Sequence, residues 1–343
     1  MRKSYNINLS VRNMNKKSGF DYDTAIYENI VCNLCGTDSF YILAKTLSNG
    51  TRVRTCMCKK CGLIYIHPRM TRSEYDRYYK TYYHEERLRT KGKTETRFKD
   101  PAGEGFKNAF RFGKALAQDF RAWIAPGTVL DVGSSYGGLL AGIRDTIEGV
   151  SVIGIEPSSA DAEYANTREI ETYNTLFEDF KNDKISSLST VFCVQTFNHL
   201  LDPRGFLAWA HNHLARGGTV ILAVKNFRQQ CRRSGAVYNS VQIDHPYMFT
   251  PETLTAMVRS VGFEIVYMDV DEYKKNRDLK KQKERGMSVH HMRLVAKKVR
   301  ENLPKEDEIK IHVNVAWLRM QLFLPYIKLY HVVAYGAWRT YLK

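Results

Sequence analysis

Residues 131–138 read Asp-Val-Gly-Ser-Ser-Tyr-Gly-Gly, and the organisation of the largest domain follows from this turn. An apolar pair precedes it and an apolar run follows it, so we expect a buried strand to end here and a helix to begin. Glycines at such a turn let a ligand press against the backbone. The spacing between Gly133 and Gly137 differs from that of the G-x-G-x-x-G loop, which argues against an NAD-dependent oxidoreductase.

From residue 128 to residue 299 the sequence alternates strand-like and helix-like segments. Expected strands cover 129–133, 152–156, 188–196, 219–224, 263–271 and 290–299. This alternation is typical of an α/β fold with a doubly wound, Rossmann-like sheet and helices on both faces. No helix separates the last two strands, so we expect them to pair antiparallel. The basic connection between them, 274–285, is expected to be solvated.

Two acidic residues lie beside the glycine turn in the predicted sheet. Asp131 comes two residues before Gly133, where it could hold an ammonium group through a water or a backbone group. Glu156 ends the next strand, where a carboxylate can accept both hydroxyls of a ribose. Together they suit a nucleoside ligand with a cationic amino-acid end rather than a ligand with a pyrophosphate.

The segment 105–300 resembles the class I S-adenosylmethionine-dependent methyltransferases. Residues 131–137 correspond to the family pattern D-x-G-x-G-x-G, with serine in place of the middle glycine. Residues 195–203 and 214–218 look like two further family segments. The resemblance implies S-adenosylmethionine as the cofactor. It also implies cofactor contacts from Asp131, Gly133, Ser135, Tyr136, Gly137, Glu156, Pro157, Glu178, Asp179, Gln195 and Thr196.

Five of the seven cysteines lie between residues 32 and 61. The C-x-x-C pairs Cys32/Cys35 and Cys58/Cys61 each direct two thiolates at one ion, and together they complete a tetrahedral shell. We therefore predict a zinc ribbon. Four cysteines leave no open position for a catalytic water, so the Zn²⁺ is expected to be structural. Cys56 is a spare thiol with a less suitable spacing, and disulfides are the alternative that a cytosolic compartment disfavours.

The order of ribbon, Tyr-rich segment and methyltransferase core resembles methyltransferases of bacterial sugar and surface-glycan pathways. Some of these are C-methyltransferases of nucleotide-linked sugars, with a Glu-His-x-x-Tyr-Phe-like segment whose histidine transfers a proton. Residues 244–249, Asp-His-Pro-Tyr-Met-Phe, occupy that place, which implies Asp244, His245 and Tyr247 at the acceptor. Those enzymes carry a large further α/β domain that has no counterpart after residue 299. We therefore expect O-methyl transfer to a sugar hydroxyl, with C-methyl transfer as the alternative.

Two histidines follow predicted strand ends, where ligands gather in sheets of this kind. A histidine is the natural base near neutral pH, and we predict that His245, or else His199, takes the proton of the acceptor hydroxyl. A hydrogen bond to the substrate or a purely structural role is the alternative for each. Asp244 is expected to hold a sugar hydroxyl.

Lys and Arg outnumber Asp and Glu by 52 to 36, which gives a net charge of +16. This balance favours anionic partners, here an anionic small molecule or glycan acceptor. An RNA methyltransferase that uses the ribbon for binding is a rival function, but the sequence lacks an Asn/Asp-Pro-Pro-Tyr motif and an arginine-rich array. A non-catalytic binding protein is a second rival. No apolar run reaches the roughly 18 residues of a membrane span and no secretory signal is present, so we expect a cytoplasmic protein.

These observations divide the chain into a flexible arm, a zinc ribbon, a Tyr-rich helical bridge with a loop over 99–105, a methyltransferase domain and a basic, aromatic helical tail. In that order the parts cover 1–28, 29–67, 68–104, 105–300 and 301–343. The tail has no acidic residue from Ile309 to Lys343, and Pro325 should break or kink its helix. Such a composition suits a helix on the inner face of an anionic membrane. Packing on the core, or on a second subunit of a homo-oligomer, is the alternative.

Overall fold

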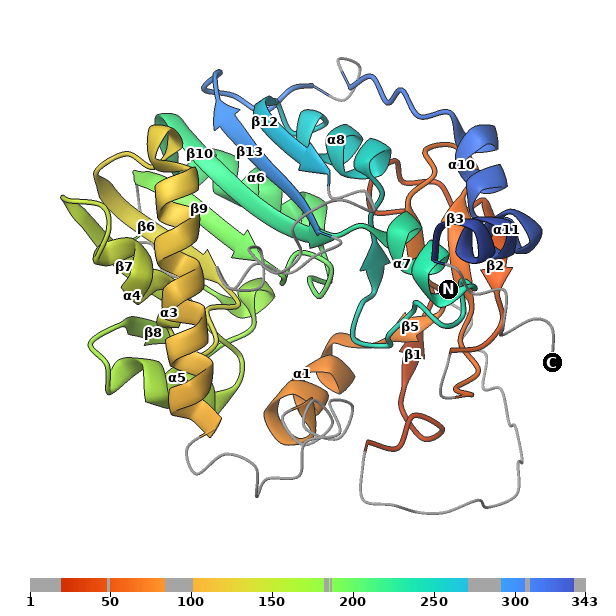
Figure 1. Cartoon of the computed structure of the whole chain (residues 1–343), viewed down its shortest axis with the longest axis horizontal. Coiled ribbons are helices and arrows are strands. Elements are labelled where there is room, and N and C mark those ends of the chain that lie inside the picture. The colour runs from red at the N-terminus through yellow and green to blue at the C-terminus, as the bar shows by residue number, and fades with distance from the viewer. Residues whose placement is uncertain are drawn as a thin grey trace, which may run out of the picture.

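A large twisted sheet organises the methyltransferase-like half of the chain, and a smaller sheet organises the cysteine-rich half (Figure 1). The structure is a computed structural model that describes residues 20–47, 50–83, 101–181, 185, 187–270, 291–305 and 309–335. The basic connection predicted over 274–285 lies outside the described residues, as do the first part of the predicted arm and the last part of the predicted bridge.

In the described residues the large sheet has the strand order β12-β13-β10-β9-β6-β7-β8. Its strands are β6 Gly127–Val132, β7 Val150–Ile155, β8 Glu171–Tyr173, β9 Leu188–Val194, β10 Leu214–Lys225, β12 Phe263–Val270 and β13 His291–Lys298. Neighbouring strands are parallel from β8 to β10, whereas β13 runs antiparallel to both β10 and β12. The predicted Rossmann-like sheet and its antiparallel last pair are therefore confirmed.

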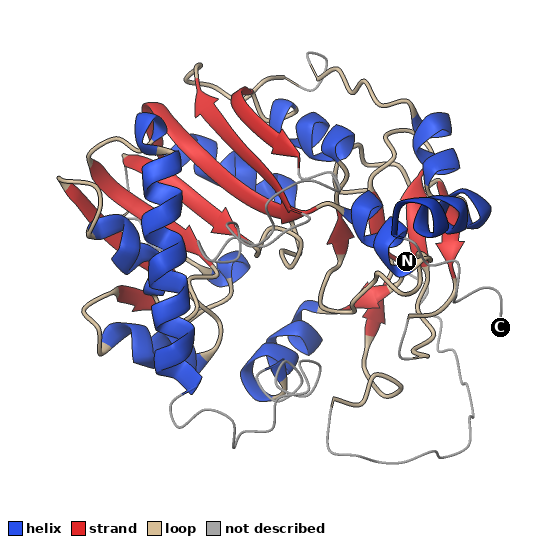
Figure 2. Cartoon of the chain, viewed as in Figure 1, coloured by secondary structure: helices blue, strands red, loops and turns tan. Residues whose placement is uncertain are grey.

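Helices cover both faces of this sheet (Figure 2). They are α3 Pro101–Asp119, α4 Gly138–Arg144, α5 Ser159–Asn166, α6 Pro203–His213 and α8 Pro251–Arg259, with short 3-10 turns η2 Arg121–Trp123 and η3 Phe177–Asp179. On one face, α3 and α4 bury side chains such as Leu116 and Leu140. On the other face, α6 and α8 bury Phe206 and Met257. Because helices cover both faces of the sheet, the side chains on both faces of the central strands are buried. These strands are therefore continuous apolar runs in the sequence.

The prediction of a loop over 99–105 is wrong for residues 101–105, because α3 begins at Pro101. Residues 99 and 100 lie outside the described residues. Proline is well tolerated in the first turn of a helix, where its missing N–H has no intrahelical partner. The nearby Gly105 serves close packing instead of a turn. A Cβ at Gly105 would lie 2.5 Å from a ring carbon of Tyr136, so the glycine lets α3 approach the 131–138 turn.

The cysteine-rich segment forms an antiparallel sheet with the strand order β11-β4-β3-β2. Its own strands are β2 Phe40–Ala44, β3 Thr55–Cys58 and β4 Ile64–Ile66. The fourth strand, β11 Tyr247–Met248, comes from the large domain and places Tyr247 opposite Tyr65. The two domains therefore share a sheet. The sequence did not predict this because a two-residue strand has no periodicity of its own.

Residues 20–28, predicted to belong to a flexible arm, pack against the rest of the chain. Phe20 is buried and meets a tyrosine of α1 (Arg72–Thr81) edge-on. The short strand β1 Tyr27–Glu28 pairs with β5 Arg69–Met70. A single apolar anchor in a polar stretch is too weak a pattern to indicate this packing from sequence.

The C-terminal part contains α10 Val315–Gln321 and α11 Leu324–Tyr335, which lie against the ribbon and α7 Phe227–Ser234 (Figure 1). Pro325 lies in the first turn of α11, so the predicted break falls between two helices. Leu318 is buried in the cluster that includes ribbon side chains. None of the helices in the described ranges combines the length and apolarity needed to cross a bilayer.

Candidate functional site

A cavity of about 740 Å³ opens where β6, β7, β9 and β10 end. Most of the predicted site residues line it, namely Asp131, Gly133, Ser135, Tyr136, Glu156, Pro157, Glu178, Gln195, Thr196, His199, Asp244 and His245. Gly137, Asp179 and Tyr247 are not among its lining residues. Tyr79 of α1 belongs to the lining as well, so the segment that follows the ribbon helps to enclose the cavity.

The glycine turn brings the backbone to the surface of this cavity. Gly133 has a φ of 79°, and a Cβ there would lie 2.1 Å from Oγ1 of Thr196. Ser135, at the place of the family's middle glycine, has a φ of 48° and donates its hydroxyl to Asp161 Oδ2 over 3.0 Å. Serine thus occupies a left-handed backbone position that glycine adopts more readily. The turn has the close backbone approach that a bound ligand requires.

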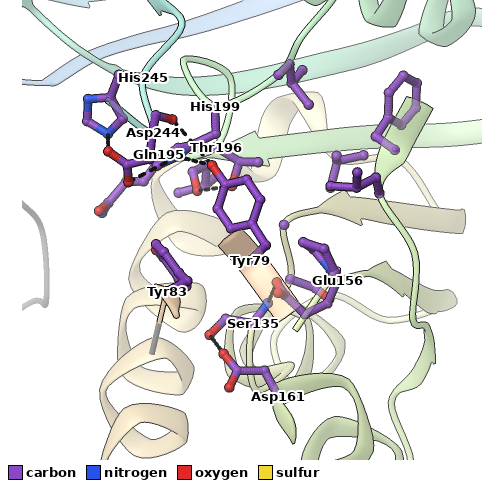
Figure 3. A pocket seen from close by; sticks show the side chains of 18 of the residues that line it. Tyr79, Tyr83, Ser135, Glu156, Asp161, Gln195, Thr196, His199, Asp244 and His245 are labelled. Atoms are coloured by element: carbon purple, nitrogen blue, oxygen red, sulfur yellow. Dashed lines mark hydrogen bonds and ion pairs between the residues drawn. The ribbon is translucent and has the colours of Figure 1, made fainter. Parts of the chain in front are cut away.

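Glu156 joins this turn from the end of β7. Its Oε2 accepts a hydrogen bond from the backbone N–H of Ser135 at 2.9 Å, and its Oε1 accepts one from Ser158 at 2.8 Å. A carboxylate has about four lone-pair sites, so it can accept more than two hydrogen bonds. Glu156 therefore shapes the turn and also lines the cavity (Figure 3).

Asp131 lies at the base of the cavity with 2% of its surface exposed. Within the described part of the chain its Oδ1 has no hydrogen-bond partner. Burial, and secondarily the charge of Glu156, raise the pKa of Asp131 well above its ordinary value. A cationic ligand group would oppose that shift and supply the missing partner. Asp131 therefore suits the ammonium end of an amino-acid ligand.

Two histidines meet at the cavity wall (Figure 3). The rings of His199 and His245 pack edge to face with centroids 4.4 Å apart. The carboxylate of Asp244 lies 3.7 Å from Nδ1 of His199 and 3.9 Å from Nε2 of His245. Burial lowers the pKa of His245 well below 6.5, and the charges of Lys225 and His199 lower it further. His245 is therefore neutral near pH 7 and able to accept a proton.

Tyr79 and Lys225 complete this cluster, and neither was among the predicted site residues. The hydroxyl of Tyr79 lies 2.9 Å from Nδ1 of His199. Nζ of Lys225 donates to Oε1 of Gln242 at 3.0 Å and lies 3.5 Å from Nε2 of His245. The position of Lys225, directly after the predicted strand 219–224, was a usable signal. Tyr79 is one of several tyrosines in its segment, and nothing in the sequence distinguishes it.

His199, Asp244 and His245 also offer nitrogen and oxygen atoms within 4.8 Å of one another, a spacing compatible with a cation site. Lys225 argues against that interpretation, because its ammonium group next to His245 opposes a second positive charge. The pKa of Asp244 is raised to about 6, because the effect of burial exceeds the opposite effect of the Lys225 charge. We therefore interpret the three side chains as an acid–base cluster.

Two of the predicted site residues serve other contacts. Asp179 forms an ion pair with Arg72, whereas its neighbour Glu178 lines the cavity and accepts a backbone N–H at 2.7 Å. The ring of Tyr247 is buried in the shared sheet, and its hydroxyl accepts a hydrogen bond from Arg69 at 3.3 Å. In both cases the sequence located the segment but did not determine the orientation of each side chain, which depends on the local turn.

The four predicted metal ligands come together in the ribbon. Their sulfur atoms lie within 4.8 Å of one another, with 3.4 Å between Cys32 and Cys61 and between Cys35 and Cys58. A tetrahedral ion with Zn–S bonds of about 2.3 Å places sulfurs roughly 3.8 Å apart, which is close to this arrangement. The backbone N–H groups of Lys60 and Cys61 point to Sγ of Cys58 at 3.3 and 3.4 Å. The group is compatible with zinc.

Residues 106–268 match a family model described as a methyltransferase domain. Among solved structures, the plantazolicin methyltransferase in complex with SAH is 14% identical, with a TM-score of 0.43 over 65% of this chain and 93% of that chain. A SAM-dependent methyltransferase from Archaeoglobus fulgidus is 16% identical, with a TM-score of 0.44 over 57% of this chain and 97% of that one. No curated protein matches the sequence.

Proposed function

We propose that this chain uses S-adenosylmethionine to methylate a hydroxyl group of a sugar, because residues 106–268 match a family model described as a methyltransferase domain. The acceptor is a nucleotide-linked sugar or a unit of a surface glycan. The observation that carries the proposal is that the buried His245 and the glycine turn at 131–138 line the same cavity. Methyl transfer to a hydroxyl needs an electrophilic methyl group and a base placed on the acceptor side.

The cofactor side of the cavity is formed by the turn at 131–138 and by Glu156. Bound there, S-adenosylmethionine supplies an electrophilic methyl group on its sulfonium. Asp131 would bind the ammonium end, since its Oδ1 is buried and has no partner in the described residues. Glu156 would bind the ribose hydroxyls, and the backbone at Gly133 allows the close approach.

The acceptor side is formed by the histidine cluster. His245 would accept the proton of the attacking hydroxyl, because burial keeps its imidazole neutral. Asp244 would hold the acceptor and favour the protonated imidazole that results. His199, hydrogen-bonded to Tyr79, packs against the His245 ring and fixes its orientation.

A sugar suits this side of the cavity because the lining offers several polar groups close together. Gln242, Asp244 and Lys225 are all lining residues and come from two segments, so they can contact different hydroxyls. Lys225 adds a positive charge, which suits an acceptor that carries a phosphate or a carboxylate. The chain's net charge of +16 also favours an anionic acceptor.

Lys225 also supports carbon methylation as a second candidate. When a base removes a proton from a carbon next to a carbonyl group, negative charge develops on the carbonyl oxygen. A lysine ammonium 3.5 Å from the base would stabilise that charge. The two candidates differ in the atom that receives the methyl group.

The two candidates are separated by an acceptor screen. The full chain is incubated with S-adenosylmethionine carrying a labelled methyl group and with a panel of nucleotide sugars and glycan termini. Mass spectrometry then identifies the product and the methylated atom. An O-methyl sugar supports the proposal, a C-methyl sugar supports the second candidate, and transfer to RNA alone would contradict both.

We propose that the four cysteines of the ribbon bind one structural Zn²⁺ ion. All four positions of a tetrahedral shell are then occupied by sulfur, which leaves none for a water or a substrate. Three of the four side chains are fully buried and the fourth is half-buried, as a closed site requires. The ion would stabilise the ribbon by joining its two C-x-x-C turns at one centre.

We propose that the α10–α11 pair rests on an anionic membrane surface. Half of the twelve exposed large apolar side chains in the described residues belong to this short region: Trp317, Met320, Phe323, Leu324, Leu329 and Val333. Residues 309–335 contain no acid, and the adjoining ribbon turn exposes Lys59 and Lys60. An equally basic second copy of the chain would be repelled, whereas acidic lipid headgroups would be attracted.

A further inference from the structure

The C-x-x-C turn from Cys32 to Cys35, here called the first cysteine knuckle, contacts the segment that carries His199. Asn33 lies between Cys32 and Cys35, and its Nδ2 donates to Oδ1 of Asp202 at 2.7 Å. In return, its Oδ1 accepts the backbone N–H of Arg204 at 2.9 Å. Asp202 caps the start of α6, three residues after His199. One side chain of the knuckle therefore fixes the segment between His199 and α6 at two points.

The ribbon also contacts the segment that carries His245. The backbone N–H of Ile66 in β4 donates to the carbonyl oxygen of Pro246 at 3.0 Å. The next two residues form β11, which pairs with β4. His245 therefore immediately precedes a stretch of backbone that is hydrogen-bonded to the ribbon sheet, while its ring lines the cavity.

Arg69 joins the two segments from the end of the ribbon. Its Nη1 donates to the carbonyl oxygen of Leu201 at 2.6 Å and lies 3.3 Å from the hydroxyl of Tyr247. Its Nε pairs with Glu28 at 2.9 Å. Arg69, Leu201 and Tyr247 are mostly buried, so the contacts among them are shielded from water, whereas Glu28 is partly exposed. Its guanidinium therefore bridges the region after His199 and the region after His245.

We propose that the cysteine ribbon sets the relative positions of His199 and His245, and that Asn33 is a positioning residue for the acid–base cluster. This inference rests on the proposed function only for its effect on turnover, because the position of the imidazoles is a structural property. The ribbon acts as a scaffold that connects the knuckle to both histidine segments. A 1 Å displacement of a reacting group is enough to slow an enzyme on the order of a hundredfold.

The test compares Asn33→Ala with Asp38→Ala, an exposed change in the same ribbon. Metal content, S-adenosylmethionine affinity, turnover and the NMR signals of the histidine imidazoles are measured on the full chain. We expect Asn33→Ala to retain its metal and its cofactor affinity, to shift the His199 imidazole signals, and to lower kcat by about tenfold or more with a smaller change in KM. Asp38→Ala should behave as the unmodified chain.

A second pair of variants covers the case in which Asn33→Ala fails to fold. Asp202→Asn keeps an oxygen that can accept from Asn33 and from the α6 backbone, whereas Asp202→Ala removes it. We expect normal imidazole signals in the first and shifted signals in the second. Unchanged imidazole signals and kcat in both Asn33→Ala and Asp202→Ala would overturn the inference. Shifted signals in a chain that methylates no acceptor would support the positioning role and contradict the proposed function.

Discussion

Nε2 of His245 lies 3.5 Å from Nζ of Lys225, inside the cavity that the glycine turn at 131–138 also lines. A lysine charge at this distance disfavours protonation of the imidazole, so it adds to the effect of burial on the pKa of His245. Burial lowers the pKa of Lys225 as well, and the charge of Asp244 acts in the opposite direction. The pair links the charge state of the base to a residue at the end of β10.

Replacement of Lys225 by methionine tests this link through the pH dependence of turnover. Removal of the charge raises the pKa of His245, so the imidazole becomes protonated, and inactive as a base, at a higher pH. The acid limb of the kcat profile should therefore move to higher pH. The exposed Lys297→Met variant is the control and should leave the profile in place. An acid limb that stays or moves to lower pH in Lys225→Met contradicts the arrangement.

Removal of the imidazole of His245 tests its role as the base. We expect His245→Ala to lower kcat by about 10²- to 10⁴-fold, the usual contribution of a positioned general base. Cofactor affinity should stay within about twofold, since Ser135 of the 131–138 turn is hydrogen-bonded to Glu156 and Asp161. The exposed His312→Ala variant serves as the control in the same assay and in calorimetry. Near-normal turnover in His245→Ala would show that another group removes the proton.

Glu156→Gln tests the cofactor side of the cavity. The amide retains one oxygen, so only one of the two backbone N–H donors from Ser135 and Ser158 keeps its acceptor. Loss of a charged acceptor costs about 1.5–3 kcal/mol, and we expect the Kd for S-adenosylmethionine to rise by about ten- to a hundredfold. Calorimetry measures the change, with the exposed Glu163→Gln as the control. Equal affinities of the two variants would be inconsistent with a role for Glu156 in binding.

Metal analysis of cysteine variants tests the ribbon. We expect about one Zn²⁺ per chain, and loss of the metal with a lower melting temperature in Cys58→Ser. Cys56→Ser is the matched control, because Cys56 is two residues away in β3 but outside the four-sulfur group. It should keep its metal. A metal-free wild-type chain, or a metal content lost equally in both variants, would contradict the four-cysteine assignment.

Vesicle flotation tests the surface of α10 and α11. The chain should float with vesicles that contain an acidic phospholipid and not with vesicles of neutral phosphatidylcholine. Introducing a charge on the exposed apolar face in Leu329→Asp should abolish the flotation, whereas Ile26→Asp, at an equally exposed site elsewhere, should not. If Leu329→Asp instead changes the molecular mass of the protein in solution from dimer to monomer, the face is an interface between two copies.

The sequence predicted the parts of the molecule that depend on regular patterns. The glycine turn and Glu156 follow from strand ends, and the cysteine group follows from its spacing. Contacts between distant segments were not predictable, because neither the two-residue strand β11 nor the Asn33 side chain leaves a periodic signal. Tyr79 reaches His199 only through the placement of α1, whereas the position of Lys225 directly after a predicted strand was a usable signal that the prediction did not take up.

The crystal structure of the chain in complex with S-adenosylhomocysteine tests the central claim most directly. The account predicts the ribose hydroxyls within hydrogen-bond distance of Glu156, the amino group next to Asp131, and the sulfur directed toward the side of the cavity that His245 lines. A ligand bound elsewhere, or a chain that takes up none while the cavity remains closed by its own side chains, would contradict it.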